Sequence, residues 1–436
     1  MKILFVSTEF EEQARGITSI IKTMVSAAKA NGHEVGVLVG YPKSDQGHSE
    51  KLDSKVEHLF LQHYLNTGKQ NLYPSLRTRK NQIKILANQE YTKIKEMRVQ
   101  HELITDKSSM ANSLDFIIKI PYIYRFMNNG LGRLVKPSLK KAVKKYAIDL
   151  VITGAPMDLT KRNVTPAKLV QFVHDTMPID LLEVPADNSA PQKFARSLYV
   201  AVTKSDLVLS NSVDTASKVE EVNPDAKIKV LYSAAPSKPE KYTDTAYLTR
   251  KSLEKDRYLL FVSVIERRKN LSTLFDAYAK AYPKIKLPLV VVGGKGFGYK
   301  QIMAHHKDLP DEIRNNIIFT GFISHADKHA LMNNARAFVF PSIYEGLGLP
   351  VLEAFASNLP VLTSNRGALP EAGGDAALYI EDPLNTDELA DGIVRIVEDE
   401  KLRQKLRDNI PKQLDMFAKD KYLDRFKEAL DSLGIG

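Results

Sequence analysis

The chain has 436 residues, 43% hydrophobic and 26% charged, a globular composition long enough for two domains. It contains no cysteine, which excludes disulfides and cysteine-ligated metal sites and is compatible with a reducing compartment. No apolar run reaches the roughly 18 residues of a membrane span, and the first apolar stretch is too short for a signal peptide. We therefore expect a cytoplasmic protein.

The net charge of +10 comes from one segment. Residues 50–145 contain 19 Lys and Arg against 8 Asp and Glu, and the rest of the chain is close to neutral. Residues 62–147 are polar, basic and predicted to be mostly helical. This segment is either a solvated helical insertion or, because aromatic residues between Tyr122 and Phe126 lie near a lysine-rich helix, a surface for anionic lipid. No motif indicates a nucleic-acid partner.

The N-terminal half begins with alternating strands and helices. Lys2–Ser7 is predicted as a strand, a helix follows Gly16, and Glu34–Val39 is the next strand, which is typical of a doubly wound α/β domain. A dinucleotide-binding dehydrogenase would need G-x-G-x-x-G directly after the first strand. This loop has only Gly16, so we discount that class.

Alternation resumes after the basic segment. The predicted strand Lys168–Val173 ends at His174 and Asp175, and ligands of open α/β sheets bind beyond the carboxyl ends of strands. A structural histidine is the simpler alternative. A polar segment with two prolines follows the last strand of this half, and we place an interdomain linker at 236–256.

A second α/β unit begins at the predicted strand Tyr258–Val264. Arg268 and Lys269 lie in the turn that follows, where cations are either solvated or available to an anion. The glycine-rich stretch at 293–298 lacks G-K-[ST] and is not a P-loop. Asp-x-Asp, which often holds the metal of sugar-nucleotide enzymes, occurs nowhere in the chain.

The stretch from Phe340 to Glu371 is the most informative. A predicted strand is followed by a loop with Gly346 and Gly348, and Pro350 opens a helix, where its missing N–H costs nothing. Free N–H groups at the start of a helix suit an anion such as phosphate. Glu345 and Glu353, about two helical turns apart, could accept hydrogen bonds from sugar hydroxyls. The alternative is an ordinary strand–helix turn with solvated glutamates.

This stretch also carries a family resemblance. E-G-L-G-L-P-V-L-E at 345–353, with P-S-I-Y before it and S-N-R-G-A-L-P-E after it, resembles the E-x-seven-E signature of retaining GT-B glycosyltransferases, the GT4-like group. V-H-D-T-M-P around His174 is similar to the family's first-domain histidine motif. E-R-R-K-N-L is similar to its E-P-R-K-N segment, with Arg267 in place of proline. The first loop has Arg15-Gly16 where the family often has two glycines.

The resemblance implies an α/β protein with two Rossmann-like parallel-sheet domains facing across a cleft. The acceptor-side domain would be 1–235 with the helical insertion at 62–147, the nucleotide-sugar domain 257–412, and a terminal helix at 413–436 would cross back to the first domain. The implied catalytic residues are Glu345, Arg268, Lys269 and His174. The implied donor-binding residues are Gly16, Gly346, Leu347, Gly348, Leu349, Glu353 and Ile323.

In the family the cations hold the donor diphosphate, Glu353 binds ribose, and Glu345 and His174 address the transferred sugar. The resemblance thus implies a retaining glycosyltransferase that needs no metal or other cofactor. Its motifs look most like mannosyltransferases of bacterial surface polysaccharide assembly, so we expect GDP-mannose as donor, with UDP- or dTDP-sugars as alternatives. The basic insertion suggests a lipid-linked saccharide acceptor at the inner face of the plasma membrane. A nucleotide-sugar epimerase and an inactive complex partner stay open as other classes.

Overall fold

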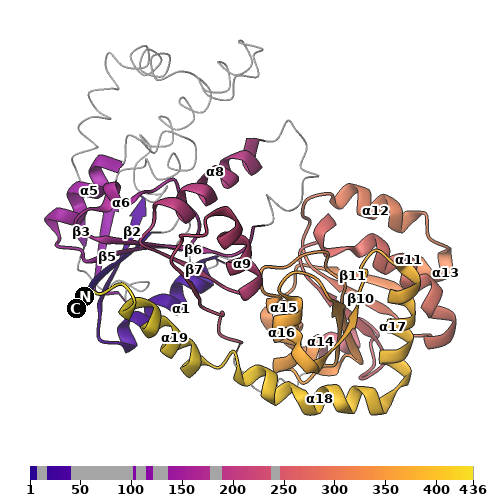
Figure 1. Ribbon diagram of the computed structural model, residues 1–436. Coiled ribbons are helices and arrows are strands. Elements are labelled where there is room, and N and C mark those ends of the chain that lie inside the picture. The colour runs from indigo at the N-terminus through magenta and orange to yellow at the C-terminus, as the bar shows by residue number, and fades with distance from the viewer. Residues whose placement is uncertain are drawn as a thin grey trace, which may run out of the picture. The chain divides into compact units, whose positions relative to one another are not determined.

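The computed structural model describes residues 1–6, 17–40, 102–104, 114–120, 136–176, 189–236 and 246–435 (Figure 1). The chain forms two compact units. The first comprises Met1–Phe172, Pro185–Val208 and Leu430–Gly436, and the second comprises Val173–Val184 and Leu209–Ala429. Gly16, most of the basic segment and much of the predicted linker lie outside the described residues.

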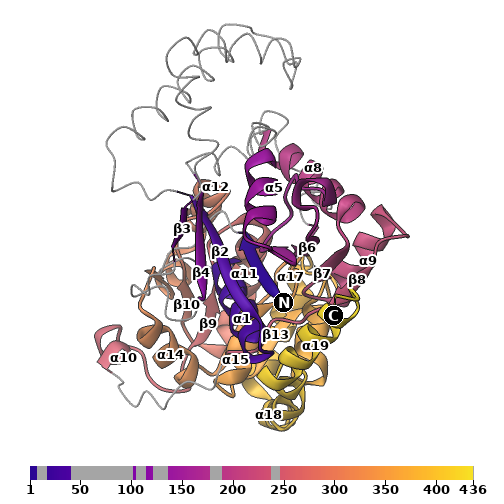
Figure 2. The same ribbon diagram turned by 90° about the vertical axis from the view of Figure 1, so that its left-hand side faces the viewer.

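An eight-stranded sheet has the order β3-β4-β2-β1-β5-β6-β7-β8 (Figure 2). The central strands β1, β5, β6 and β7 are largely buried apolar runs, as expected for a mainly parallel sheet covered on both faces. The strands are β1 (Lys2–Val6), β2 (Glu34–Gly40), β3 (Glu102–Ile104), β4 (Phe116–Ile120), β5 (Leu150–Thr153), β6 (Lys168–Val173), β7 (Leu207–Ser210) and β8 (Ile228–Val230). The helices between them are α1 (Ile17–Ala30), α5 (Lys136–Lys145), α6 (Lys161–Val164), α8 (Ser189–Lys204) and α9 (Val213–Val222).

Two of these strands, β3 and β4, lie within residues 62–147, which are predicted to be mostly helical, so the prediction is wrong at these two places; most of the segment lies outside the described residues, and there it stays a prediction. β4 pairs in parallel with β2, and β3 pairs antiparallel to β4. The sequence Phe116-Ile-Ile-Lys-Ile120 is rich in β-branched residues, which favour a pleated and half-buried surface. Phe116 is buried in the core beside Gly36, where it stabilises the sheet. The predicted basic helix is present as α5.

The six-stranded sheet of the second unit is entirely parallel, with the order β11-β10-β9-β12-β13-β14. The chain order reverses between β9 and β12, and ligands of such sheets bind at this switch point, beyond the carboxyl ends of the strands. The predicted doubly wound architecture is confirmed. The strands are β9 (Leu259–Val262), β10 (Leu289–Val292), β11 (Ile317–Gly321), β12 (Ala337–Phe340), β13 (Val361–Ser364) and β14 (Ala377–Ile380).

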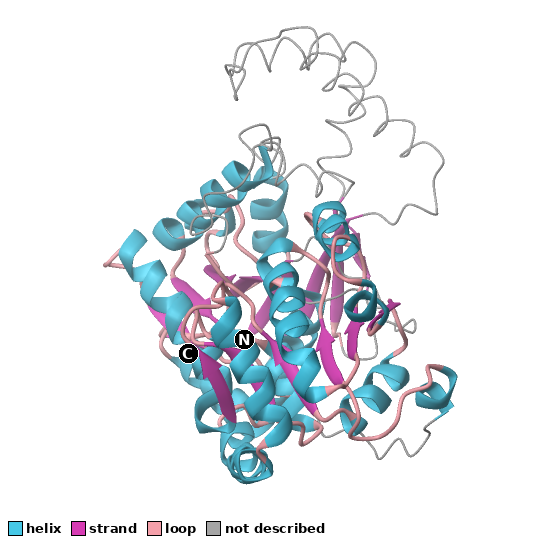
Figure 3. Cartoon of the chain, turned by 90° about the vertical axis from the view of Figure 1, so that its right-hand side faces the viewer, coloured by secondary structure: helices cyan, strands magenta, loops and turns pink. Residues whose placement is uncertain are grey.

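Helices pack against these strands and bury their apolar faces in one core (Figure 3). Pro350 lies in the first turn of α15, as predicted. The helical elements are α10 (Ala246–Arg250), η2 (Arg267–Lys269), α11 (Leu271–Ile285), α12 (Tyr299–Lys307), α13 (Asp311–Asn315), α14 (His325–Asn334), α15 (Leu349–Ala356), α16 (Leu369–Gly373), η3 (Gly374–Ala376) and α17 (Thr386–Glu398). No helix among the described residues combines the length and the hydrophobicity needed to cross a bilayer.

The last helix begins a few residues later than the terminal helix predicted from residue 413. α18 (Glu400–Asp415) continues through Pro411, and α19 (Lys419–Asp431) begins after a break. The ring of Phe417 in this break is buried, and its carbonyl accepts a hydrogen bond from the Ala235 N–H at 2.9 Å. Burial of the aromatic ring and use of its carbonyl outside the helix explain why the helical pattern is interrupted here.

Candidate functional site

A turn with two cations follows β9 at the switch point. Arg268 and Lys269 lie in the short helix η2, which ends at Asn270 with φ 61°. Asparagine is one of the few residues that tolerate this left-handed conformation. The Asn270 side-chain amide donates to the carbonyls of Pro341 at 3.1 Å and Pro383 at 2.6 Å, which fixes the turn against the loops that follow β12 and β14.

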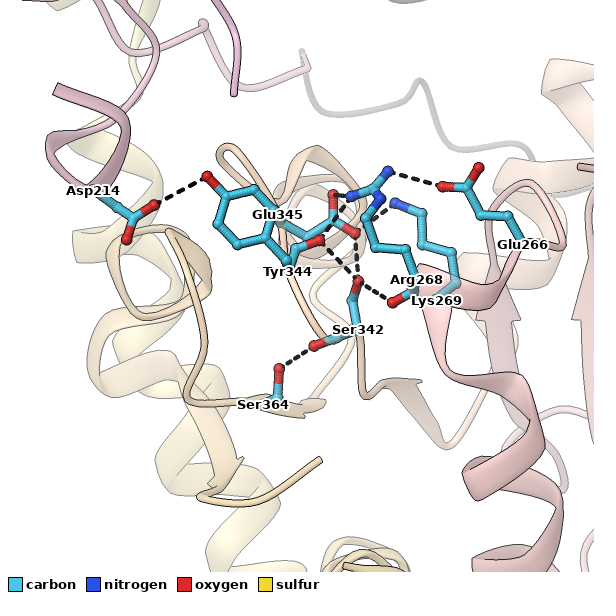
Figure 4. A network of polar contacts seen from close by, with 8 residues as sticks. All are labelled: Asp214, Glu266, Arg268, Lys269, Ser342, Tyr344, Glu345 and Ser364. Atoms are coloured by element: carbon cyan, nitrogen blue, oxygen red, sulfur yellow. Dashed lines mark hydrogen bonds and ion pairs between the residues drawn. The ribbon is translucent and has the colours of Figure 1, made fainter. Parts of the chain in front are cut away.

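The carboxylate of Glu345, in the loop after β12, points toward both of these cations (Figure 4). Its Oε1 accepts hydrogen bonds from Lys269 Nζ at 2.5 Å and Ser342 Oγ at 2.7 Å, and its Oε2 accepts one from Arg268 Nη1 at 2.8 Å. Only 7% of Glu345 and 5% of Lys269 are exposed. Burial alone would raise the pKa of Glu345, but the charges of Lys269 and Arg268 outweigh it and lower that pKa.

Arg268 has a second carboxylate partner, Glu266. Its Nη2 donates to Glu266 at 2.9 Å, and its Nη1 also donates to the Tyr344 carbonyl at 2.7 Å. Burial opposes the charged form of Arg268, but the charges of Glu345 and Glu266 outweigh it and raise the pKa above its usual value. Burial has the larger effect on Lys269, whose pKa is lowered. The turn therefore holds two oriented cationic groups in a place where water is largely excluded.

Gly346 follows Glu345 and makes the closest backbone approach of this loop. A Cβ atom at this position would lie 2.1 Å from the His174 carbonyl oxygen and 2.9 Å from Asp175 Cβ, so no other residue fits without movement. Gly348 has φ 97°, which glycine adopts at no steric cost, and no side chain caps the α15 helix that follows it. The loop thus brings the start of α15 close to the backbone of His174.

Glu353, the second predicted glutamate, has a different environment. It is the fifth residue of α15, and its Oε1 accepts a hydrogen bond from Lys328 Nζ at 2.8 Å. Ile323 is half-buried against the core in the loop before α14, next to Phe322, which is 70% exposed.

The structure thus joins three of the predicted residues, Arg268, Lys269 and Glu345, in one bonded cluster. His174 lies against Gly346 through its backbone, and Gly16 is outside the described residues. Glu353 and Ile323 are not bonded to the cluster, and the side chain of Leu347 is buried in the core.

Sequence reasoning missed four polar residues that complete this region. Glu266 and Ser342 bond to the cluster, and Lys328 bonds to Glu353. Glu371, the last residue of the E-x-seven-E stretch and its flanks, accepts hydrogen bonds from the Val213 and Asp214 N–H groups of α9, each at 2.7 Å, and from the Tyr232 hydroxyl at 2.9 Å. The available sequence signals were that Ser342 lies two residues after β12 and that Glu266, Ser342 and Glu371 belong to the segments that resemble the family.

The cluster can bind an anion and position hydroxyl groups. Arg268 and Lys269 offer charge-assisted N–H donors, which suit phosphate oxygens. Among the described residues, no group of three His, Asp or Glu could hold a metal ion. A nucleoside diphosphate is the ligand class whose charge and hydroxyls match this combination of cations, loop amides and carboxylates.

Comparison with known proteins shows which fold and which protein family this chain resembles. The fold resembles that of Anabaena HepE, solved in complex with UDP and glucose, with a TM-score of 0.65 over 99% of this chain and 100% of that chain at 17% identity. This likeness shows the fold, which is that of the GT-B glycosyltransferases. Residues 248–413 match the family described as Glycosyl transferases group 1. The predicted GT4-like resemblance is therefore confirmed over this part of the chain.

The sequence relatives match this chain over only part of its length. The chain is 33% identical over 151 residues to the O-antigen chain mannosyltransferase B of Escherichia coli, a match that covers 34% of this chain and 38% of that protein. It is 26% identical over 326 residues to the serotype-specific mannosyltransferase WbdA of Escherichia coli, which covers 67% of this chain and 38% of that protein. The chain therefore spans about two fifths of the length of each of these relatives.

Proposed function

We propose that the chain is a retaining, metal-independent glycosyltransferase that transfers mannose from GDP-mannose to a saccharide acceptor in surface polysaccharide biosynthesis. The cluster of Arg268, Lys269 and Glu345 at the switch point of the second sheet is the observation that carries this proposal. The group 1 domain and the two mannosyltransferase relatives support it.

The chemistry explains why two fixed cations are needed. When the glycosidic bond of the donor breaks, negative charge grows on the nucleotide diphosphate. Arg268 and Lys269 are oriented before the donor arrives and lie where water is largely excluded, so they stabilise this charge with little reorganisation. The N–H groups at the start of α15 add to this effect.

The remaining residues act on hydroxyl groups in this proposal. Glu353 accepts hydrogen bonds from ribose, and Glu345 and His174 address the transferred sugar. The acceptor hydroxyl oxygen bonds to the anomeric carbon on the face from which the diphosphate leaves. Its proton passes to an oxygen of the leaving diphosphate, so no separate general base is needed.

The donor and the acceptor follow from the comparisons and the charge pattern. Both curated relatives are mannosyltransferases, which favours GDP-mannose, whereas the UDP in the HepE structure favours a UDP-sugar as the alternative. The excess of Lys and Arg at 50–145 supports a lipid-linked acceptor at an anionic membrane surface.

Transfer assays with labelled GDP-mannose and a membrane lipid extract from the source cells test this function. Glu345→Ala and Lys269→Ala should each lower transfer by at least about 10²-fold, since each removes a group that acts on the developing charge or on the sugar. EDTA should leave the wild-type rate unchanged. Lys286→Ala and Glu312→Ala, which separate an exposed ion pair in the same unit, are matched controls that should keep full activity.

Other outcomes would overturn parts of the proposal. Loss of activity with EDTA contradicts the metal-independent mechanism. Consumption of the donor without a glycosylated product indicates an epimerase, and tight nucleotide binding without turnover indicates an inactive partner.

A further inference from the structure

Lys328 forms an ion pair with Glu353 that joins the beginning of α14 to the second turn of α15. Lys328 is the fourth residue of α14, and Glu353 is the fifth residue of α15. The Ser324 hydroxyl caps the start of α14 by accepting a hydrogen bond from the Asp327 N–H at 3.1 Å. The lysine therefore extends from an ordered helix start toward the carboxylate.

Burial separates this pair from the ordinary surface pairs of the same unit. The side chains of Lys328 and Glu353 are 16% and 29% exposed, whereas those of Lys286 and Glu312 are 56% and 65% exposed. Exposed pairs are screened by water and contribute little to stability. The partly buried lysine instead fixes the orientation of its carboxylate partner, because less water is available to replace it.

The contact with Lys328 uses only one oxygen of Glu353. Nζ bonds to Oε1 at 2.8 Å, and within the described part of the chain no hydrogen bond reaches Oε2. A carboxylate can accept about four hydrogen bonds, so Oε2 is available to a ligand hydroxyl while Oε1 stays bound. This arrangement differs from that of Glu345, where both oxygens are bonded to protein groups.

We propose that Lys328 is a positioning residue that orients the Glu353 carboxylate so that Oε2 accepts a ribose hydroxyl of the donor nucleotide. This inference rests on the proposed function, in which Glu353 binds ribose. It makes Lys328 a determinant of specificity, because a lysine that acts through Glu353 favours ribonucleotides over nucleotides that lack the hydroxyls.

Calorimetric titration of the full chain with GDP and with 2′,3′-dideoxy-GDP tests the inference. Lys328→Met should raise the Kd for GDP about tenfold, the size typical of coupling between groups in contact. It should change the Kd for dideoxy-GDP by less than about twofold, since no ribose hydroxyl is left to lose. Lys328→Arg, which keeps the charge, should restore most of the GDP affinity. Lys286→Met, which breaks an exposed pair, should change neither Kd.

A double-mutant cycle provides the second measurement. In a Glu353→Gln background, Lys328→Met should have almost no further effect on the Kd for GDP. Equal losses for GDP and dideoxy-GDP would overturn the inference and leave the proposed function intact. A gain in GDP affinity would overturn it too, because the lysine would then compete with the nucleotide.

The same titrations separate this inference from the proposed function. If the wild type binds UDP and not GDP, the donor assignment is wrong, and the UDP and dideoxy-UDP pair tests Lys328 in the same way. If the wild type binds none of GDP, UDP and ADP, the proposed function and this inference both fail.

Discussion

Glu345 and Glu353 are eight positions apart in one motif, yet they differ in burial and in hydrogen-bond partners. Glu345 is in the loop after β12, is buried, and bonds to two cations and a hydroxyl. Glu353 is on α15, is partly exposed, and bonds to one lysine through one oxygen. The comparison shows that two carboxylates of one motif have different surroundings: both oxygens of Glu345 are bonded within a buried cluster, whereas Glu353, within the described part of the chain, accepts the hydrogen bond from Lys328 through one oxygen.

Glu345 has more partners than Glu353 because it lies where two neighbouring strands of the sheet end. β9 and β12 are neighbours in the sheet, so the turn after one meets the loop after the other and encloses Glu345. Glu353 lies about one helical turn beyond that loop, and it bonds to Lys328 of α14. Three predictions follow from this comparison, in order of decreasing effect.

Glu345→Ala should destabilise the second unit by about 3–5 kcal/mol, because it leaves Lys269 buried without its carboxylate and removes one of two partners of Arg268. Urea unfolding of the purified protein measures this loss. Glu312→Ala, which removes a carboxylate from an exposed pair, should cost less than about 1 kcal/mol. Similar losses for the two variants would show that the buried cluster does not balance charge as described.

Acid should weaken the protein partly through Glu345. Its pKa is lower in the folded state than its usual value of 4.5, so the folded state binds fewer protons, and the stability that this group contributes is lost as pH falls below about 4.5. The free energy of unfolding should therefore fall less steeply between pH 6 and pH 3.5 in Glu345→Gln than in the wild type.

A control for this pH effect is Glu400→Gln. The pKa of Glu400 is also lowered, by its hydrogen bond to Arg403, but its side chain is 65% exposed. Solvent screening should make its effect on the pH dependence smaller than that of Glu345. An equal or larger effect from Glu400 would contradict the assignment of the acid sensitivity to the buried cluster.

Glu353→Ala should have the smallest effect on folding, about 1.5 kcal/mol, since it removes one charge-assisted hydrogen bond at a partly buried pair, whereas Glu345→Ala removes the partner of two buried cations. The same variant should nevertheless weaken nucleotide binding. Unfolding and titration of one preparation measure both quantities. A loss of stability comparable with that of Glu345→Ala would remove the distinction between the two glutamates.

Most of the fold could be predicted because its strands are short apolar runs between polar turns. β6 was predicted at its observed bounds, Lys168–Val173. The errors lie where local patterns compete with tertiary contacts. Phe116–Ile120 joins a sheet that the basic composition around it concealed, and burial of Phe417 interrupts a continuous helical pattern.

The site could be predicted only where its residues follow strand ends or belong to the motif. Arg268, Lys269 and Glu345 met both conditions, and the structure joins them. Lys328 met neither, because helical periodicity shows which face of α14 is buried and not which helix lies beside it. The ion pair between Lys328 and Glu353 depends on where the tertiary structure places α14 relative to α15, which no local pattern specifies.

Asn270 fixes the shape of the turn that holds Arg268 and Lys269. Glycine would accept φ 61° and glutamine would offer the same amide, but asparagine does both, and it thereby ties three chain segments together at one side chain. Because these segments are already joined, little conformational entropy remains to be lost when an anion arrives. Tolerance to substitution at this position should therefore be decided by backbone shape and amide geometry together, and hardly at all by side-chain volume.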